Sequence, residues 1–365
     1  MAQPEIPFLR PAAVMACLGL AALNACTAGS GTSDAGLPAP RVIVAEPDAE
    51  GRQLYAMNHA MNNAMLAELR QAIPRLAELD DPGVMRVMHA MGPNYTWYLS
   101  PAGLQQAYGV LVLAHGFQDQ GDRVLRQRLQ PVAEQAPTAL ALGMSMMTSD
   151  HVQLALNNLE AAGATDIVVI PAVSTQHNTM LRQWDYIFSR EPEPAYARVA
   201  RVGTRARLHF APPLDDDPLV GDILIDYAAE ISRLPEREEV IIVAHGPEGE
   251  ADNQAQLVML RRLADYVAAR SDYAAVRVAT LQDDAVAAVR SDNVAELRAM
   301  VVAAAAQGRD VLLVTNLLGT RTVQSRLRLD LRGLRYRFNR KGLVQHPNFV
   351  TWVNAAVAAA VGQPQ

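Results

Sequence analysis

The sequence predicts an α/β protein made of two tandem domains, each an open parallel sheet flanked by helices, related to each other by internal duplication. Three observations support this fold class. The chain has 365 residues and half of them are apolar, which is enough for two cores of ordinary size. From residue 108 onwards, short β-rich runs alternate with helical patterns. The order of these runs then recurs in the second half of the chain.

The N-terminal residues have the pattern of an export signal. One cation, Arg10, precedes an apolar run over 12–23 that is too short to span a bilayer. The last residue of the run begins the segment Leu23-Asn24-Ala25-Cys26, which resembles the lipobox of bacterial lipoproteins, with Asn24 in place of the usual small residue. We expect a signal peptide over 1–25, a lipid on Cys26 and an exported, periplasmic or outer-membrane location. An ordinary secretory signal that is cleaved elsewhere is the alternative.

Cysteine usage agrees with export. The chain has only Cys17 and Cys26, and the first lies within the removable segment, so the mature chain would have no free thiol and no internal disulfide. Residues 26–50 are predicted to form a flexible tether, because the stretch over 27–40 is rich in Gly, Ser, Thr, Ala and Pro and cannot form a core.

A helical N-terminal extension is predicted over residues 51–107. Methionines recur there at four-residue spacing, which favours a helix, and a helical hairpin would break near 81–83. Thioethers and imidazoles together could form a site for a soft metal. We favour packing of these side chains in the core, because methionines at helical spacing more often have that role. The side chains concerned are Met57, His59, Met61, Met65, Met85, Met88, His89 and Met91.

The first α/β domain is predicted over 108–215. A buried strand over 109–114 ends at His115-Gly116, and a helix over about 121–134 follows. The pattern continues with a strand at 139–142, a helix over 152–162 capped by Ser149 or Asp150, and a strand at 167–170. A stretch over 191–217 that is rich in charge and proline separates the halves, with the boundary near 215–218.

The second domain is predicted over 216–365 and repeats this order. The run 240–244 ends before His245-Gly246, as the run 110–114 ends before His115-Gly116. The elements that follow are a helix over about 252–269, strands at 276–280 and 311–314, and between them a helix over 293–306. Gly163 precedes the strand of the first half as Gly308 precedes that of the second. The repeat therefore indicates duplication.

Three histidines follow predicted strands. Because the carboxyl ends of parallel strands meet at one crevice, residues placed there face a shared ligand site. His115 ends one strand and His177 follows the strand at 167–170 after a loop, so we expect these two imidazoles to converge; His245 holds the equivalent position in the second half. Neutral imidazole binds divalent cobalt, nickel, iron and zinc and accepts protons near neutral pH. A local hydrogen bond at a strand end is the alternative for any one of them.

These segments together resemble the class II tetrapyrrole chelatases, and within them the sirohydrochlorin cobaltochelatases and ferrochelatases. The resemblance implies flavodoxin-like, chelatase-like domains that insert a divalent metal into a sirohydrochlorin-type tetrapyrrole without a nucleotide, in cobalamin or sirohaem metabolism. Cobalt is the first expectation for the metal, and iron or nickel are the others. The likeness rests on residues 109–116, 161–171, His177, 241–246 and 342–352.

The resemblance also implies site residues. The chelatase pattern uses two histidines and one glutamate that face the macrocycle. His115 and His177 occupy the two histidine positions of the first half, with catalytic and metal-binding roles, and Met146 occupies the glutamate position. In the second half His245 is kept and the second histidine position falls near Arg321. Met146, His245 and Arg321 are therefore expected to contact the substrate.

Neither half keeps the family carboxylate. Met146 stands at that position in the first half and Gln282 at the matching position of the second. A carboxylate would help to attract the cation and to take protons from the ring. Asp150, His151 and Glu160 are the candidates in the first half to replace it.

Charge patterning indicates the partners. Tetrapyrrole precursors carry many carboxylates, which arginine forks bind well, and a basic segment runs from Arg321 to Lys341; a solvated surface is the alternative for it. The net charge of −6 and the 5% of aromatic residues argue against nucleic acid. The expected partners are a tetrapyrrole and, through the lipid anchor only, a membrane, and the sequence is compatible with a homo-oligomer.

Two other functions fit parts of the sequence. A non-catalytic tetrapyrrole- or metal-binding periplasmic lipoprotein is favoured by the export signal and by the missing carboxylates. A two-lobed solute-binding lipoprotein that closes on another ligand shares the signal and the two α/β lobes, but it gives no reason for histidines at related strand ends.

Overall fold

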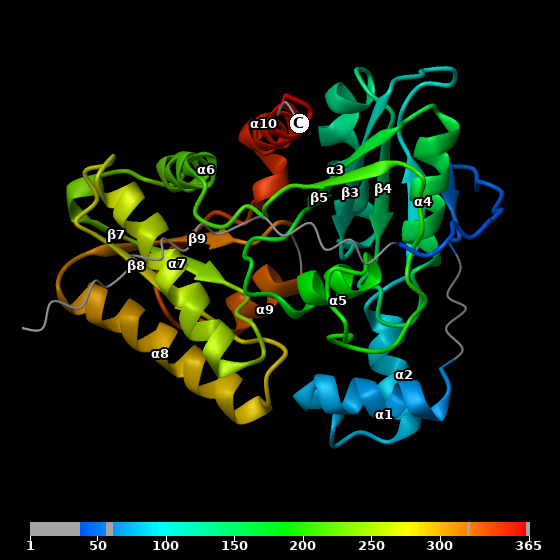
Figure 1. The fold of residues 1–365 in the computed structure, drawn as a ribbon. Helices are drawn as coiled ribbons and strands as arrows, with labels where there is room; N and C mark the ends of the chain where they lie inside the picture. The colour runs from blue at the N-terminus through cyan, green and yellow to red at the C-terminus, as the bar shows by residue number, and fades with distance from the viewer. Residues whose placement is uncertain (1–36, 56–60, 320–321, 363–365) are drawn as a thin grey trace, which may run out of the picture. The chain divides into compact units, whose positions relative to one another are not determined.

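The computed structural model describes residues 37–55, 61–319 and 322–362 and has the predicted α/β architecture (Figure 1). It contains two sheets whose strands are mostly parallel and which are flanked by helices. The first has the strand order β1-β2-β4-β3-β5-β6 and the second the order β10-β9-β7-β8. Within the described residues, both sheets belong to one structural unit.

The first sheet is parallel over β3 to β6. β3 lies in its interior between β4 and β5 and has apolar residues on both faces, as expected for a strand that is covered by helices on both sides. The predicted alternation of strands and helices is confirmed, with boundaries shifted by a few residues. The elements are β3 (Tyr108–Ala114), α3 (Gln118–Ala133), β4 (Thr138–Leu142), α4 (Asp150–Ala161), β5 (Asp166–Pro171), α5 (Thr179–Ile187) and β6 (Arg207–Phe210).

The N-terminal extension is not wholly helical. β1 (Arg52–Gln53) and β2 (Tyr95–Tyr98) lie within it, and β2 adds to β4 in an antiparallel direction, with Tyr95 opposite Leu142. The run Tyr-Thr-Trp-Tyr consists of aromatic and β-branched residues, which favour strands. The first sheet is therefore mixed. The residue types of β2 are the sequence signal from which this strand could have been predicted.

The helical part of the extension consists of α1 (Asn63–Ala72), the single 3₁₀ turn η1 (Pro74–Leu76) and α2 (Asp81–Ala90). The break lies over residues 73–80, before the predicted Asp81-Pro82-Gly83. Asp80 caps α2 by accepting a hydrogen bond of 2.8 Å from the Gly83 N–H. Pro82 is tolerated because it lies in the first turn, where its missing N–H breaks no helical bond.

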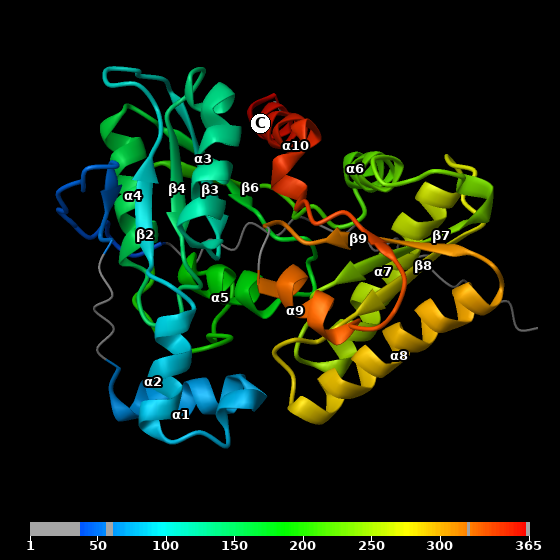
Figure 2. The same cartoon turned by 180° about the vertical axis from the view of Figure 1, so that it is seen from behind.

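The second sheet is parallel throughout and repeats the predicted order of elements (Figure 2). Both His-Gly turns have the same backbone geometry, since Gly116 has a φ of 88° and Gly246 a φ of 77°. The elements are α6 (Pro218–Ala229), η2 (Pro235–Arg237), β7 (Glu238–Ala244), α7 (Glu250–Ala268), β8 (Ala275–Thr280), α8 (Ala287–Ala306), β9 (Asp310–Asn316), α9 (Thr322–Asp330), β10 (Arg337–Phe338), η3 (Leu343–Gln345) and α10 (Pro347–Val361).

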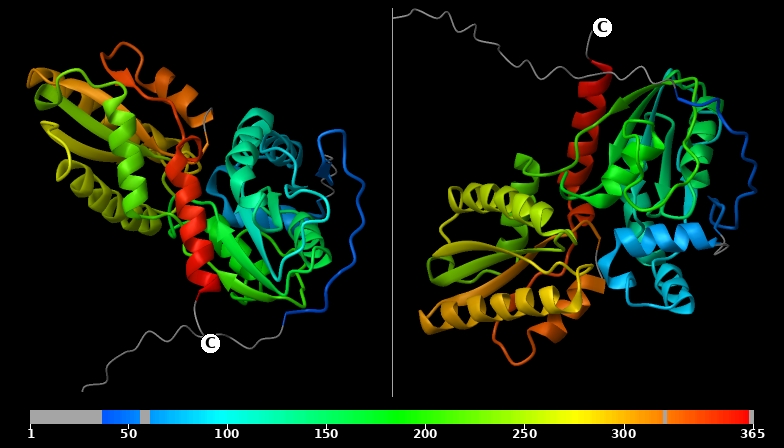
Figure 3. Two further views of the ribbon diagram at one scale, coloured as in Figure 1. Left: turned by 90° about the horizontal axis from the view of Figure 1, so that it is seen from above. Right: turned by 60° about the horizontal axis from the view of Figure 1, so that its bottom comes forward.

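One apolar core joins the two sheets. The last helix, α10, packs against α6 of its own half and also against α3 and β5 of the first half (Figure 3). Its buried side chains are Phe349, Trp352 and Val353. They belong to the same cluster of apolar residues as Val112 and Ile242 in the two central strands. The C-terminal helix therefore fastens the second half to the first.

Residues 37–50, predicted to belong to a flexible tether, lie against the first half. The carbonyl oxygen of Arg41 accepts a hydrogen bond of 2.9 Å from Asn157 in α4, and the Arg41 guanidinium pairs with Asp150. The carbonyl oxygen of Glu50 accepts a bond of 2.9 Å from the Trp97 indole. Composition could not predict this order, because main-chain and ionic contacts hold the segment instead of apolar side chains.

The predicted signal peptide and Cys26 lie outside the described residues. Among the helices that the structure describes, none is both long and apolar enough to cross a membrane.

Candidate functional site

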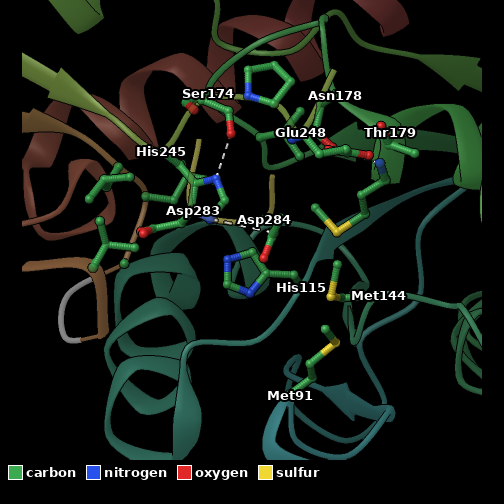
Figure 4. Close-up of a pocket in the computed structure, with 18 of the residues that line it drawn as sticks. Met91, His115, Met144, Ser174, Asn178, Thr179, His245, Glu248, Asp283 and Asp284 are labelled. Carbon is green, nitrogen blue, oxygen red and sulfur yellow. Dashed lines mark hydrogen bonds and ion pairs between the residues drawn. The ribbon is translucent and has the colours of Figure 1, made fainter. Parts of the chain in front are cut away.

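A pocket of about 530 Å³ opens at the carboxyl ends of β3 and β7, where ligands bind in open parallel sheets. This volume lies in the usual range for small-molecule sites. Residues from both halves and from the N-terminal helices line it. Figure 4 shows His115, His245 and Asp284 gathered at its centre, with Met91 and Met144 beside them.

His115 directly follows β3, has an exposed side chain and lines the pocket. Burial and the charge of His245 lower the pKa of His115, and contacts with the Gly116 backbone and with Asp284 oppose the change only in part. His115 is therefore neutral at pH 7 and has a nitrogen lone pair available for a cation or a proton.

His245 follows β7, the equivalent strand of the second half. Its Nδ1 lies 2.8 Å from the carbonyl oxygen of Gly246. Because a carbonyl can only accept, Nδ1 carries a hydrogen, and in the neutral form of the ring the lone pair is on Nε2. Nε2 lies 3.7 Å from Oδ2 of Asp284. A backbone acceptor that fixes the tautomer in this way is typical of histidines that bind metals.

Asp284 supplies a carboxylate that the predicted site lacked. It lies in the loop after β8, two residues beyond Gln282, which occupies the predicted glutamate position. Gln282 is buried and donates to the carbonyl oxygen of Pro247 at 3.1 Å, so it does not serve the pocket. Asp284 does line the pocket, and its Oδ1 lies 2.8 Å from Nη1 of Arg75. An acidic side chain next to the expected position was the sequence signal that could have identified it.

The neighbouring Asp283 is buried and is neutralised by arginines. Its Oδ1 lies 2.6 Å from Nε of Arg290 and 3.3 Å from Nη1 of Arg326. Arg326 is the one member of the predicted basic segment, within the described residues, that lines the pocket. Arg321 lies outside the described residues. Arg337 pairs with Glu238, and Lys341 pairs with Glu230. The other arginines of the segment are exposed: Arg328, Arg332, Arg335 and Arg340.

His177 does not line the pocket, so the expected convergence of His115 and His177 is not observed. Its backbone N–H donates to the Thr175 hydroxyl at 3.2 Å, and its imidazole lies near Asp215. Burial raises the pKa of Asp215, and the charge of His177 opposes this rise. The loop after β5 presents Ser174 and Thr175 to the pocket instead. The structure thus pairs His115 with His245, across the two halves.

Met146 also lies outside the main pocket, since its side chain is buried in the core of the first half. Met144, two residues earlier, lines the pocket in its place. The candidates for a replacement carboxylate or base in the first half have other partners, and none of them lines the pocket. Asp150 pairs with Arg41, Glu160 accepts from Thr204, and His151 is buried beside Ser145.

One wall of the pocket is apolar and rich in thioethers. The side chains of Met91, Met144 and Met180 contribute to it, together with Val87 and Ala90 of α2. Flexible methionines and small apolar residues suit the flat face of a large ring. The N-terminal helices therefore form part of the pocket wall, while Met88 packs in the core. Met57 and His59 lie outside the described residues.

Across the part of the chain that the structure describes, no three His, Cys, Asp or Glu side chains are arranged as a ready-made metal site. The pocket offers the two imidazoles and Asp284 as separate groups.

No protein-family model and no curated protein sequence matches this chain. Solved structures do match it. SirB from Bacillus subtilis with Fe³⁺ has a TM-score of 0.51 at 14% identity, covering 71% of this chain and 98% of SirB. The likeness to SirB shows that the chain has a chelatase-like fold.

Two further structures have lower TM-scores. DR2241 from Deinococcus radiodurans, described as a multi-domain protein with structural similarity to chelatases, has a TM-score of 0.44 at 16% identity, covering 71% of this chain and 56% of its own. CbiX, described as the terminal enzyme for biosynthesis of siroheme in denitrifying bacteria, has a TM-score of 0.44 at 17% identity, covering 69% of this chain and 99% of its own.

Proposed function

We propose that this protein inserts a divalent metal ion into a tetrapyrrole ring. The observation that carries the proposal is the presence of His115 and His245, from matching strand ends of the two halves, in one pocket with Asp284. The chelatase-like fold supports this class of reaction. The apolar wall around Met144 provides a surface on which one face of the ring can lie.

The chemistry of insertion matches these groups. One divalent cation replaces two pyrrole N–H protons, so the site must hold the cation briefly and accept protons as they leave. Neutral His115 and Nε2 of His245 have lone pairs for both tasks, and the charge of Asp284 attracts the cation. Imidazole suits cobalt, iron and nickel. We propose cobalt first, with iron or nickel as alternatives, and a sirohydrochlorin-type ring; no step requires a nucleotide.

The test is metal insertion by the purified protein. With sirohydrochlorin and Co²⁺, the visible absorption of the ring changes as the metal enters. We expect His115→Ala and His245→Ala each to reduce the rate by about 100-fold or more, as for the loss of a group that transfers protons. His177→Ala is the matched control, because that histidine also follows a strand but lies outside the pocket, and it should keep the wild-type rate. Unchanged rates in both pocket variants would refute the proposal.

A carrier that binds the ring or the metal without reaction is the second candidate. The observation in its favour is that Asp284 is paired with Arg75 and so is partly neutralised. Tight ring binding in an equilibrium titration, without acceleration of metal insertion, would select this function.

We also propose that the protein is exported and anchored to a membrane by a lipid on Cys26. The apolar run over 12–23, followed directly by Leu23-Asn24-Ala25-Cys26, supports this location.

A further inference from the structure

We infer that Arg75 binds a carboxylate of the ring and thereby releases Asp284 for the metal and the pyrrole protons. This inference rests on the proposed function and names a residue that selects the substrate. Arg75 belongs to the N-terminal helices, outside the part of the chain that carries the chelatase resemblance.

Arg75 is presented to the pocket from a fixed backbone. It is the central residue of η1, and its neighbours Ile73 and Leu76 are buried in the core of the first half. The side chains of Arg75 and Asp284 are 31% and 29% exposed, and both line the pocket. The ion pair therefore lies at the pocket surface, where a ligand can reach it.

The guanidinium of Arg75 has an unused donor. Nη1 contacts Asp284, while the Nε–H group is buried and has no hydrogen-bond partner in the described structure. A buried donor without a partner is unfavourable, and a guanidinium binds a carboxylate best through two parallel hydrogen bonds. A carboxylate in the pocket can take both hydrogen bonds once the guanidinium turns so that Nε, buried here, faces the pocket, and this turn breaks its contact with Asp284.

The charges in the pocket explain why a transfer of Arg75 from Asp284 to a ring carboxylate would matter. The pocket already contains Asp283, Asp284 and Glu248, so an additional carboxylate is accepted only where a cation meets it. When a ring carboxylate pairs with Arg75, Asp284 loses its counter-charge and stays close to Nε2 of His245. Its negative charge then acts on the incoming metal. Ring binding would thus strengthen metal binding, and by reciprocity the metal would strengthen ring binding.

Ring binding tests this directly. Uroporphyrin, which has eight carboxylates, is titrated into the protein without metal, and its fluorescence is followed. We expect Arg75→Met to weaken binding by about 10- to 100-fold, the usual effect of losing a charged hydrogen-bonding partner. Arg75→Lys keeps the charge but loses the fork and should be intermediate. Arg86→Met is the matched control, since Arg86 is an exposed arginine of α2 outside the pocket, and it should bind like the wild type.

The variant Asp284→Asn distinguishes competition between Asp284 and the ring for Arg75 from a purely structural role of the Arg75–Asp284 ion pair. If Asp284 competes with the ring for Arg75, its neutralisation should tighten uroporphyrin binding several-fold while it slows metal insertion. A tetracationic N-methylpyridinium porphyrin of similar ring size should not lose affinity in Arg75→Met. This opposite response to ring charge is not expected from a folding defect.

The outcomes distinguish this inference from the proposed function. Wild-type affinity for uroporphyrin in both Arg75→Met and Asp284→Asn would overturn the inference even if metal insertion is observed. Absence of uroporphyrin binding by the wild type would overturn it as well. The expected affinity changes without any metal insertion would support the role of Arg75 and refute the insertion activity.

Discussion

Oδ2 of Asp284 lies 3.7 Å from Nε2 of His245, and the two residues follow the neighbouring strands β8 and β7 of the second sheet. The Gly246 carbonyl holds a hydrogen on the other ring nitrogen, so in the neutral form of the ring the lone pair is on Nε2. The second half therefore supplies an imidazole and a carboxylate, and the first half supplies His115.

The coupling of the two histidines can be measured. The charge of His245 is one of the causes that lower the pKa of His115, so His245→Gln should raise the pKa of His115 towards its ordinary value of about 6.5. Asp284→Asn should lower it further, because Asp284 acts in the opposite direction. NMR titration of the His115 ring resonances gives both values. Identical titration curves in the three proteins would contradict the shared pocket.

Acid should destabilise the protein through His151. This histidine is buried in α4, and burial lowers its pKa to about 3. Unfolding returns the pKa to about 6.5, so the unfolded chain binds the extra proton between these values and stability falls as pH decreases below about 6.5. From pH 7 to pH 5 we expect a loss of about 2 kcal/mol from this residue.

Urea unfolding at several pH values measures that loss. His151→Gln, which cannot be protonated, should show a shallower decrease between pH 7 and pH 5. A slope equal to that of the wild type would show that other groups control acid unfolding.

The two His-Gly turns should tolerate a methyl group unequally. Both glycines have positive φ, which costs other residues about 1–2 kcal/mol. A Cβ at Gly116 would find its nearest atoms at 3.9 Å, whereas a Cβ at Gly246 would lie 2.8 Å from the backbone nitrogen of Gln282. Gly246→Ala should therefore destabilise the protein more than Gly116→Ala and displace His245. Thermal unfolding of both variants measures the difference, and equal losses would contradict the crowding at Gly246.

The C-terminal helix should contribute strongly to stability. Trp352 is 3% exposed and belongs to the core that joins the two halves. Trp352→Ala should cost about 3–5 kcal/mol, since it removes a large buried side chain and leaves a cavity. Val361→Ala, at an exposed position of the same helix, should have little effect. Comparable urea midpoints for both variants would show that α10 does not fasten the halves.

The proposed lipid anchor depends on the thiol of Cys26. Cys26→Ser should move the protein from the membrane fraction to the soluble fraction and abolish labelling by a radioactive fatty acid. Membrane association of the variant, or absence of label in the wild type, would contradict the proposed anchor.

The sequence was a reliable guide to local structure. The runs before His115 and His245 are apolar on both faces, and the helices between strands have marked boundaries, so the order of elements could be predicted. β2 was missed because it lies next to methionine-rich helices, although its residues favour a strand. The contacts of residues 37–50 had no compositional signal.

The site could be predicted only in part. His115, His177 and His245 were identified from their position after strands, and His115 and His245 line the pocket, whereas His177 lies outside it. Met146 was placed in the site by analogy and also lies outside this pocket. Asp284 and Arg75 were not predicted, because one lies in a loop and the other in a distant segment. No spacing rule relates residues 75 and 284.

The amino-acid sequence alone determined the α/β fold, its repetition and the two histidines at matching strand ends, because apolar periodicity and turn residues act over short distances along the chain. Only the tertiary structure decided which imidazoles meet, which carboxylate lies beside them and that the N-terminal helices complete the wall. These relationships depend on how the two sheets and α10 pack around one core, and that packing brings together residues that are far apart in the chain.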